Sequence, residues 1–383
     1  MFFLLLSALV FAQDLSVPPN NIVFKPNKGL EIKSGDGDFK MVTRLRAQQR
    51  YTLIDNEEGV SHGFQLRRAR LMFKGNVFGE HNSYKFELAV SPKDMGLKPE
   101  GTISKSPLLD WYFYFSQIRD LNLRMGQYKV PYSRQRVVSS GNLQMVDRSL
   151  ANGEFNLDRD VGMDIRSKDL FGLDMFRYYA GIYMGEGHSS YSEGDLGMMY
   201  LARFEMLPMG LYKDYVESDL NRTTTPKMSI GAGFAYVDEA KRDEGIVGSI
   251  PSDGGTTDTL NFNADVGFKY SGLSFEGAYF WREGTRNPGD ESPVEEARNG
   301  TGFYAQGGYL FAHSNVEIST RYGQILPADG ETSLTAENEA GIGFSNYVGE
   351  HSLKLQGDLF REWGPDGFSE GENEFRLQLQ MAY

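Results

Sequence analysis

The sequence of 383 residues contains no cysteine, which excludes thiol catalysis, disulfide bonds and cysteine-ligated metal sites. After the N-terminal segment, no stretch approaches about 18 consecutive apolar residues, so a membrane-spanning helix is excluded as well. The five histidines are scattered, without a nucleophile or base at catalytic spacing. Walker and dinucleotide-binding glycine patterns are also absent, so we expect neither a cofactor nor an enzyme.

A surplus of positive charge is missing too. The formal net charge is −13, and we therefore expect no nucleic-acid partner. Positive residues are also lacking in the N-terminal run MFFLLLSALVFA, although its length and its small residues near Ala12 are typical of a secretory signal peptide. We expect residues 1–12 to be cleaved, and residues 13–38, rich in proline, asparagine and glycine, to form a periplasmic lead-in.

Glycine and aromatic residues are abundant, with 44 glycines and 13% aromatics. From Phe39 onward, segments of about ten residues alternate apolar and polar side chains, which is the period of a strand with two different faces. The last segment is typical: every second residue from Phe375 to Tyr383 is apolar. The pattern predicts sixteen strands at 39–54, 64–77, 83–91, 109–118, 121–128, 161–167, 175–184, 198–207, 227–237, 259–270, 273–282, 302–312, 316–326, 337–347, 352–361 and 373–383.

Short connections follow the even-numbered predicted strands, and long, acidic ones fall between them. Transmembrane barrels have short periplasmic turns and longer outer loops, so the alternation predicts an all-β, antiparallel transmembrane barrel formed by residues 39–383 as a single domain. A soluble β-sandwich would share the alternation within strands but not this order of loop lengths. Residues 208–226 are the exception, too long for a tight turn, and we interpret them as an ordered periplasmic excursion.

Four segments resemble the phosphate-selective porin O and P family: FQLRRARLMFKG at 64–75, MGQYKVPYSRQR at 125–136, MVDRSLAN with RDVGM at 145–163, and YYAGIYMGEG at 178–187. The resemblance implies a sixteen-stranded barrel of the bacterial outer membrane, usually a homotrimer, whose third outer loop folds into the lumen. Family barrels commonly end on Phe, whereas this chain ends on Tyr383, a mild change in the aromatic signal for the barrel-assembly machinery. The resemblance favours a porin more firmly than it favours phosphate.

The first two predicted strands carry cations on one face. A cation that faced lipid near the midplane would cost about 2–4 kcal/mol, so we expect this face to line the lumen. With the turn closed at 57–59, Arg50 would lie opposite Arg68, Gln48 opposite Arg70 and Arg44 opposite Lys74. Because Arg67 and Arg68 are adjacent, one of them needs a bulge or an interfacial position. The alternative is a solvated wall whose arginines pair with acids such as Glu87, Asp110 or Glu276.

The connection from Lys129 to Arg148 is basic, with Asp147 as its single acid, in a chain whose other loops are acidic. We expect it to fold into the barrel, although an outward surface loop is the alternative. Guanidinium groups bind oxyanions in bidentate fashion, and lysine supplies a point charge. The residues expected to line the pore or bind anions are Arg44, Arg46, Arg50, Arg68, Arg70, Lys74, Asp110, Lys129, Ser133, Arg134, Arg136 and Arg148.

The sequence therefore favours an outer-membrane porin that is exported through the periplasm, lies among outer-membrane lipids and passes small anions such as phosphate. Asp110, predicted to point inward, would temper the cations or form a salt bridge with a wall arginine. Two alternatives stay open at this point. One is a general diffusion porin for small hydrophilic solutes without a specific site, and the other is a structural or adhesive surface barrel.

Overall fold

The computed structural model describes residues 21–98, 102–189, 197–290 and 295–383. The expected signal peptide, residues 1–12, and the first part of the lead-in lie outside these ranges. In the part of the chain that is described, no helix is long and apolar enough to cross a membrane.

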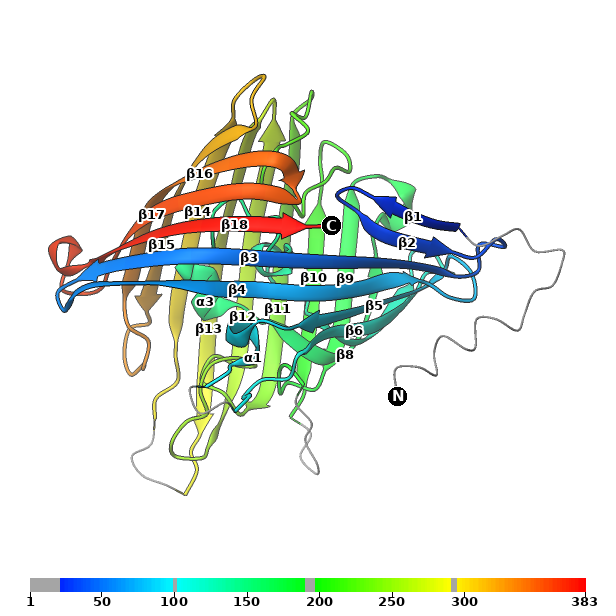
Figure 1. Ribbon diagram of the computed structural model, residues 1–383. Helices are drawn as coiled ribbons and strands as arrows, with labels where there is room; N and C mark the ends of the chain where they lie inside the picture. Colours follow the sequence, from blue (N-terminus) through cyan, green and yellow to red (C-terminus); the bar gives the residue numbers. More distant parts are fainter. Residues whose placement is uncertain (1–20, 99–101, 190–196, 291–294) are drawn as a thin grey trace.

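A closed antiparallel barrel of sixteen strands dominates the structure, and all sixteen predicted strands are confirmed (Figure 1). Each strand pairs with the next in sequence, and the last strand pairs with the first, which closes the barrel. The strands are β3 (Lys40–Asn56), β4 (Gly59–Asn76), β5 (Asn82–Ala89), β6 (Leu108–Phe115), β7 (Asn122–Lys129), β8 (Arg159–Ser167), β9 (Phe176–Tyr183), β10 (Met199–Met206), β11 (Lys227–Ala240), β12 (Thr256–Tyr270), β13 (Leu273–Asn287), β14 (Gly300–Leu310), β15 (Val316–Pro327), β16 (Glu337–His351), β17 (Leu353–Trp363) and β18 (Glu372–Ala382).

Several strands run further than the hydropathy pattern indicates. β4 begins five residues before the predicted start, and β13 continues five residues beyond the predicted end. The added residues at these ends are mostly polar or glycine, as in GVSHG at 59–63. Backbone pairing between neighbouring strands does not require apolar side chains, so hairpins continue past the apolar belt.

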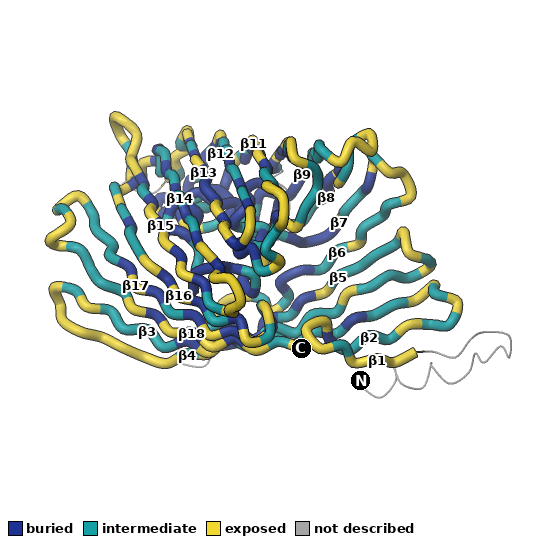
Figure 2. Tube along the Cα trace, turned by 90° about the horizontal axis from the view of Figure 1, so that it is seen from above, coloured by how far each residue is buried: buried dark blue, intermediate teal, exposed yellow. Residues whose placement is uncertain are grey.

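The outer face of the barrel is apolar, as alternation predicts. In β18, Phe375, Leu377, Leu379 and Met381 are exposed, whereas the intervening Arg376, Gln378 and Gln380 are buried inside. Figure 2 shows buried residues concentrated within the barrel and exposed residues along its turns. A face of this kind suits lipid contact, because polar groups are kept from the hydrocarbon.

A short hairpin precedes the barrel, in the segment that the sequence analysis treated as a lead-in without strands. β1 (Asn21–Lys25) pairs with β2 (Gly29–Lys33), and β2 pairs with the first residues of β3. The hairpin therefore extends the wall beyond the end of β18, where the Tyr383 backbone N–H donates to the Leu45 carbonyl at 3.1 Å. Pro26, Asn27 and Gly29 mark the turn between the two strands.

Two connections turn inward and fill part of the interior, residues 130–158 between β7 and β8 and residues 207–226 between β10 and β11. The segment 130–158 between β7 and β8 contains the short helices α2 (Arg134–Val137) and α3 (Leu150–Phe155). It packs against the inner side of β9 to β15 through a hydrophobic core. The other helices of the described ranges are α1 (Pro92–Met95), η2 (Leu170–Gly172) and η3 (Phe368–Glu370), all in connections between strands. The core thus lies inside the barrel and occupies one side of it.

Gly126 on β7 allows a first test of the wall that carries the basic connection. Its φ is +129°, and a Cβ there would lie 2.2 Å from the Trp111 carbonyl oxygen of β6. We expect Gly126→Ala to lower the free energy of unfolding by about 2 kcal/mol or more, because both the dihedral and the contact are unfavourable. Urea unfolding in detergent, followed by circular dichroism, measures the change. Gly357→Ala is the control, since its Cβ would meet nothing closer than 3.6 Å, and equal losses in both variants would contradict this assignment.

Candidate functional site

The cationic hairpin β3–β4 faces the lumen, but the predicted pairs are wrong. Arg46 lies opposite Arg70, Gln48 opposite Arg68, Arg44 opposite Met72 and Val42 opposite Lys74. The turn comprises only Glu57 and Glu58, one residue shorter than the expected 57–59, and one extra residue interrupts the ladder. These two shifts together stagger the column, so that only one pair of guanidinium groups is directly opposed.

The extra residue is Arg67, between the paired residues Leu66 and Arg68. A bulge re-aims a side chain that strict alternation would send outward. Arg67 and Arg68 consequently both reach Asp147, at 3.4 and 3.1 Å, and Arg50 reaches the same carboxylate at 3.0 Å. Burial alone would raise the pKa of the Asp147 carboxyl, but Arg68, Arg50 and Arg67 outweigh burial and hold the pKa well below its usual range. The single acid of the basic connection thus attaches it to the β3–β4 wall.

Further bonds attach the connection to β16 and β17, which lie close to β3 in the closed barrel. The backbone N–H of Val146 donates to Asp358 of β17 at 3.0 Å, and that of Leu150 donates to Glu339 of β16 at 3.1 Å. Ser149 caps α3 by accepting from the Asn152 backbone N–H at 3.1 Å. Segment 130–158 is therefore attached to β3, β4, β16 and β17, which lie on one side of the barrel.

The other side of this segment is apolar or fully ion-paired. Phe155 stacks on Phe280 of β13, with ring centroids 6.0 Å apart. Glu154 accepts from Arg282 and, at 2.6 Å, from Arg298. These contacts exclude solvent from the β13 side, so open space remains beside β3 to β8.

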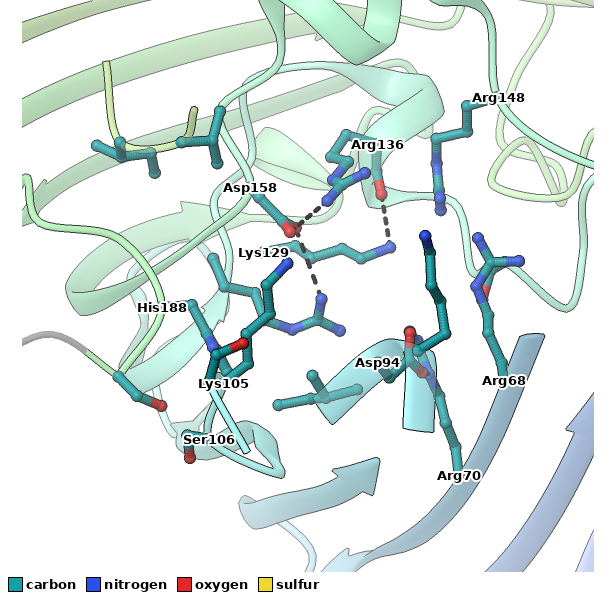
Figure 3. A pocket seen from close by; sticks show the side chains of 18 of the residues that line it. Arg68, Arg70, Asp94, Lys105, Ser106, Lys129, Arg136, Arg148, Asp158 and His188 are labelled. Carbon is teal, nitrogen blue, oxygen red and sulfur yellow. Dashed lines mark hydrogen bonds and ion pairs between the residues drawn. The ribbon is translucent and has the colours of Figure 1, made fainter. Parts of the chain in front are cut away.

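A cavity of about 550 Å³ lies in that open space, at the outer side of the basic connection. Figure 3 shows Lys129, Arg148 and Arg68 directed toward its middle. Arg136 pairs with Asp158, whereas Lys129 Nζ donates to the carbonyl oxygens of Arg136 and Val138 at 2.6 and 3.2 Å. Further basic side chains at the wall of this cavity are Arg67, Arg70, Lys93, Lys105, Arg159 and Arg242.

Arg148 resembles Lys129 in having carbonyl partners. Its Nε donates to Gln135 at 2.9 Å and its Nη2 to Val138 at 2.7 Å. Burial, followed by the charges of Arg136 and Arg68, lowers the pKa of the Arg148 guanidinium to about 9. No carboxylate of a described residue lies within 4.0 Å of the charged groups of Lys129 or Arg148. The positive potential at this point is therefore only partly neutralised.

The basic lining continues toward the periplasmic turns through three more cavities, of which two share wall residues with the first and the third shares Lys85 and Tyr112 with those two. Arg46 donates to the hydroxyls of Ser139 and Ser140 at 3.0 and 2.9 Å, and its Nε has no hydrogen-bond partner. Four acids line the four cavities: Glu87, Asp94, Asp110 and Asp158. The basic residues that line the three further cavities are more numerous: Lys40, Arg44, Arg46, Arg70, Lys74, Lys85, Arg124, Lys129, Arg159, Arg166 and Lys168. Cationic groups thus follow one wall from end to end.

Most of the predicted site residues are brought together along this wall. Arg44, Arg46, Arg68, Arg70, Lys74, Asp110, Lys129, Arg136 and Arg148 line one or more of the four cavities. Asp110 faces inward and accepts from Lys85 at 2.5 Å and from Arg159 at 2.6 Å. Asp110 therefore forms salt bridges, which was one of the two roles expected for it.

Three predicted residues lie away from the cavities. Arg134 is fully buried and paired with Asp265 at 2.9 Å and Asp214 at 3.0 Å. Ser133 is buried where it accepts from the Asn152 side chain at 2.7 Å. Arg50 is occupied by Asp147 and by Gln378. The sequence places Ser133 and Arg134 in the basic connection and Arg50 on a cationic strand face, but it does not show which of the arginines contact a carboxylate.

Sequence reasoning also missed basic residues of the wall. Lys85 alternates with the outward Tyr84 and Phe86, so the strand pattern carried a signal for its inward position. Arg159, Lys105 and Arg242 come from a strand start and two outer loops, and their approach to the cavity depends on the fold. In the described ranges, no group of three or more histidine and acidic side chains is arranged to hold a metal ion.

Asp147 offers a test of how the connection is attached. We expect Asp147→Asn to lower the free energy of unfolding by about 3 kcal/mol at neutral pH, since three guanidinium groups lose their carboxylate. The folded pKa of Asp147 is depressed, so its contribution is present above the unfolded pKa of about 3.9 and is lost as the pH falls further. Urea unfolding between neutral pH and about pH 3 should therefore show that the free energies of unfolding of the parent and of Asp147→Asn become more similar as the pH falls.

The matched control is Glu80→Gln, which neutralises an exposed acid in the β4–β5 turn. If the difference in free energy of unfolding between the parent and Asp147→Asn stayed constant below the unfolded pKa, this would contradict the stated role of the carboxylate.

Comparison with known proteins agrees with this architecture. Residues 39–318 match the family described as phosphate-selective porin O and P. The anion-selective porin from Comamonas acidovorans is a similar structure, with 11% identity, a TM-score of 0.61, and coverage of 90% of this chain and 99% of that chain. The outer membrane channel DcaP of Acinetobacter baumannii has 11% identity, a TM-score of 0.57, and coverage of 90% and 97%.

The loop L8 deletion mutant of the outer membrane protein OmpT of Vibrio cholerae also has 11% identity and a TM-score of 0.57, with coverage of 90% of this chain and 99% of that chain. No curated protein matches the sequence. At such low identity the structural likeness concerns the fold, whereas the family match extends over most of the chain. The family and fold are those of channel proteins rather than enzymes. The chain belongs to the phosphate-selective porin O and P family of β-barrel porins in the bacterial outer membrane.

Proposed function

We propose that this porin passes small anions by passive diffusion along the β3–β8 side of its lumen. The observation that carries the proposal is the row of cations along one wall, in which Arg46, Lys129 and Arg148 have only hydroxyl or carbonyl partners among the described residues. A mobile anion can neutralise the positive charge that remains on these three groups. Cations in solution meet a positive potential along the same path.

Small oxyanions, with phosphate as the leading one, fit this lining better than halides alone. Guanidinium and ammonium groups next to serine hydroxyls supply several donors to one oxyanion. Ser139 and Ser140 lie beside Arg46, and Ser140 borders the cavity that Lys129 and Arg148 line. Several moderate sites in series allow an ion to enter and still leave, as conduction requires.

The proposal includes the cellular setting of the channel. Residues 1–12 are removed on export, and residues 13–38 face the periplasm. The barrel works as a homotrimer, and the barrel-assembly machinery reads the C-terminal strand that ends at Tyr383. The alternating apolar face of β18 supports this last point, because its outward side chains run without interruption to the aromatic terminus.

Anion preference is measured directly in planar bilayers. In a potassium chloride gradient, we expect the reversal potential of single channels to have the sign that chloride selectivity gives, because the permeation path is lined with cations. Phosphate added at millimolar concentration should reduce the chloride current by occupying the same groups. A reversal potential that indicates cation preference would reject the proposed function.

Lys129 tests the oxyanion site itself. We expect Lys129→Gln to weaken phosphate block about tenfold, because one charge-assisted hydrogen bond to the anion is lost. Glutamine keeps amide donors for the Arg136 and Val138 carbonyl oxygens that Lys129 now bonds. Lys28→Gln makes the same charge change on the exposed β1–β2 turn and should leave the block unchanged. Equal block in all three proteins would exclude Lys129 from the site.

A further inference from the structure

The connection between β10 and β11, residues 207–226, does not stay on the periplasmic surface. Lys269 of β12 points inward, and its Nζ donates to the carbonyl oxygens of Lys213, Val216 and Ser218 at 2.9, 2.5 and 3.1 Å. A single wall lysine thus holds three backbone groups of the connection. The excursion expected from the sequence is ordered, but it enters the lumen.

Asp214 of this connection completes a buried ion cluster. Its carboxylate accepts from Arg134 at 3.0 Å and from Arg177 of β9 at 2.8 Å. The cluster consists of three arginines and three acids: Arg134, Arg177, Arg203, Glu205, Asp214 and Asp265. Equal numbers of opposite charges allow such a group to be buried, and removal of one acid leaves a guanidinium uncompensated.

Two more contacts join the connection directly to the basic segment 130–158. The Gln144 backbone N–H donates to Glu217 at 2.7 Å, and the Glu217 backbone N–H donates to the Asn142 carbonyl at 3.2 Å. Ser218 then donates to Glu317 of β15 at 2.8 Å. An outer loop and a periplasmic connection therefore meet inside the barrel and share hydrogen bonds.

The wall behind this meeting point has the composition of a water-filled lumen. Its inward side chains are polar or small, yet they are buried beneath residues 142–149 and 212–219. Its charged side chains are nearly balanced in sign, in contrast to the basic wall opposite. The buried polar residues of this wall include Ser229, Asn261, Asn263, Asp265, Lys269, Ser274, Glu276, Arg282, Gln306, Glu317, Ser319, Arg321, Glu339, Ser345, Lys354, Gln356 and Asp358.

We infer that residues 212–219 form a plug that, together with segment 130–158, closes the β11–β17 half of the lumen, so that ions pass only along the basic β3–β8 half. The plug sets charge selectivity by keeping wall acids such as Glu276 and Glu317 away from the permeating ion. Asp214 and Glu217 are its positioning residues, because they attach it to the basic segment. The selectivity part of this inference rests on the proposed function, whereas the closure of half the lumen does not.

Removal of the plug is the direct test. Residues 209–227 are replaced by Asn-Gly, which joins β10 and β11 in the register that Met206 and Ile230 already have. We expect single-channel conductance to rise by up to about twofold, since the space that residues 212–219 fill becomes open to water beside the existing path. The reversal potential in a potassium chloride gradient should shift toward cation permeation, because the wall of the added space carries acids and cations in nearly equal number, unlike the basic β3–β8 wall.

A milder pair of variants keeps the length of the chain. Asp214→Asn with Glu217→Gln should raise conductance and open-channel noise, because the plug loses its attachment to segment 130–158. The matched control is Glu80→Gln with Asp174→Asn, which removes two exposed acids from other periplasmic turns and should behave like the parent. This comparison decides the matter if the deletion variant fails to fold.

A disulfide checks the contact itself in the membrane. The chain has no cysteine, so Asn142→Cys with Glu217→Cys introduces the only thiols. Oxidation should cross-link the two segments and restore the parent conductance, and reduction should release it. Absence of the cross-link in folded protein would contradict the inference.

The outcomes separate this inference from the proposed function. Unchanged conductance and unchanged reversal potential in the folded deletion variant would overturn the plug. A parent channel that prefers cations would overturn the proposed function instead, while a rise in conductance on deletion would still support closure of half the lumen.

Discussion

The structure depends on the pairing of inward-facing arginines with carboxylates that two infolded segments carry. Asp147 on the outer segment accepts from three guanidinium groups of β3 and β4, and Asp214 on the periplasmic connection joins Arg134 to Arg177. A buried charge without a partner costs several kcal/mol, so each segment has a strong reason to stay in its place. Of these five arginines, four lie on strands of the barrel, whereas both acids lie on the connections.

Compensation is uneven between the two halves of the lumen. On the β9–β15 side, arginines and acids balance, and an apolar core with Phe155 and Phe280 excludes water. On the β3–β8 side, acids are few and several cations have only carbonyl or hydroxyl partners. The proposed anion preference follows from this difference, because mobile anions can neutralise the cations that the protein leaves without a carboxylate. One half of the interior stabilises the fold, and the other half contains the proposed path for ions.

Strand positions were predictable, because an apolar belt between two aqueous sides imposes alternation on every strand that crosses it. The same alternation predicted the inward position of Asp110 and carried a signal for Lys85 that was missed. Register was less predictable: the extra residue Arg67 and a turn one residue shorter than expected gave other cationic pairs in the first hairpin than those predicted. The β1–β2 hairpin was missed since its turn residues dominate a short segment, although Ile22, Phe24, Leu30 and Ile32 alternate.

The sequence by itself determined the barrel, its sixteen crossings and the basic character of segment 129–148, because these follow from local periodicity and composition. Only the tertiary structure decided which cations face the path. Arg134 and Arg136 lie two residues apart, yet Arg134 is buried among acids and Arg136 borders the cavity. Arg134 pairs with Asp265, more than a hundred residues further along the chain, whereas Arg136 pairs with the much nearer Asp158. Such pairings arise only when the barrel closes and the connections turn inward.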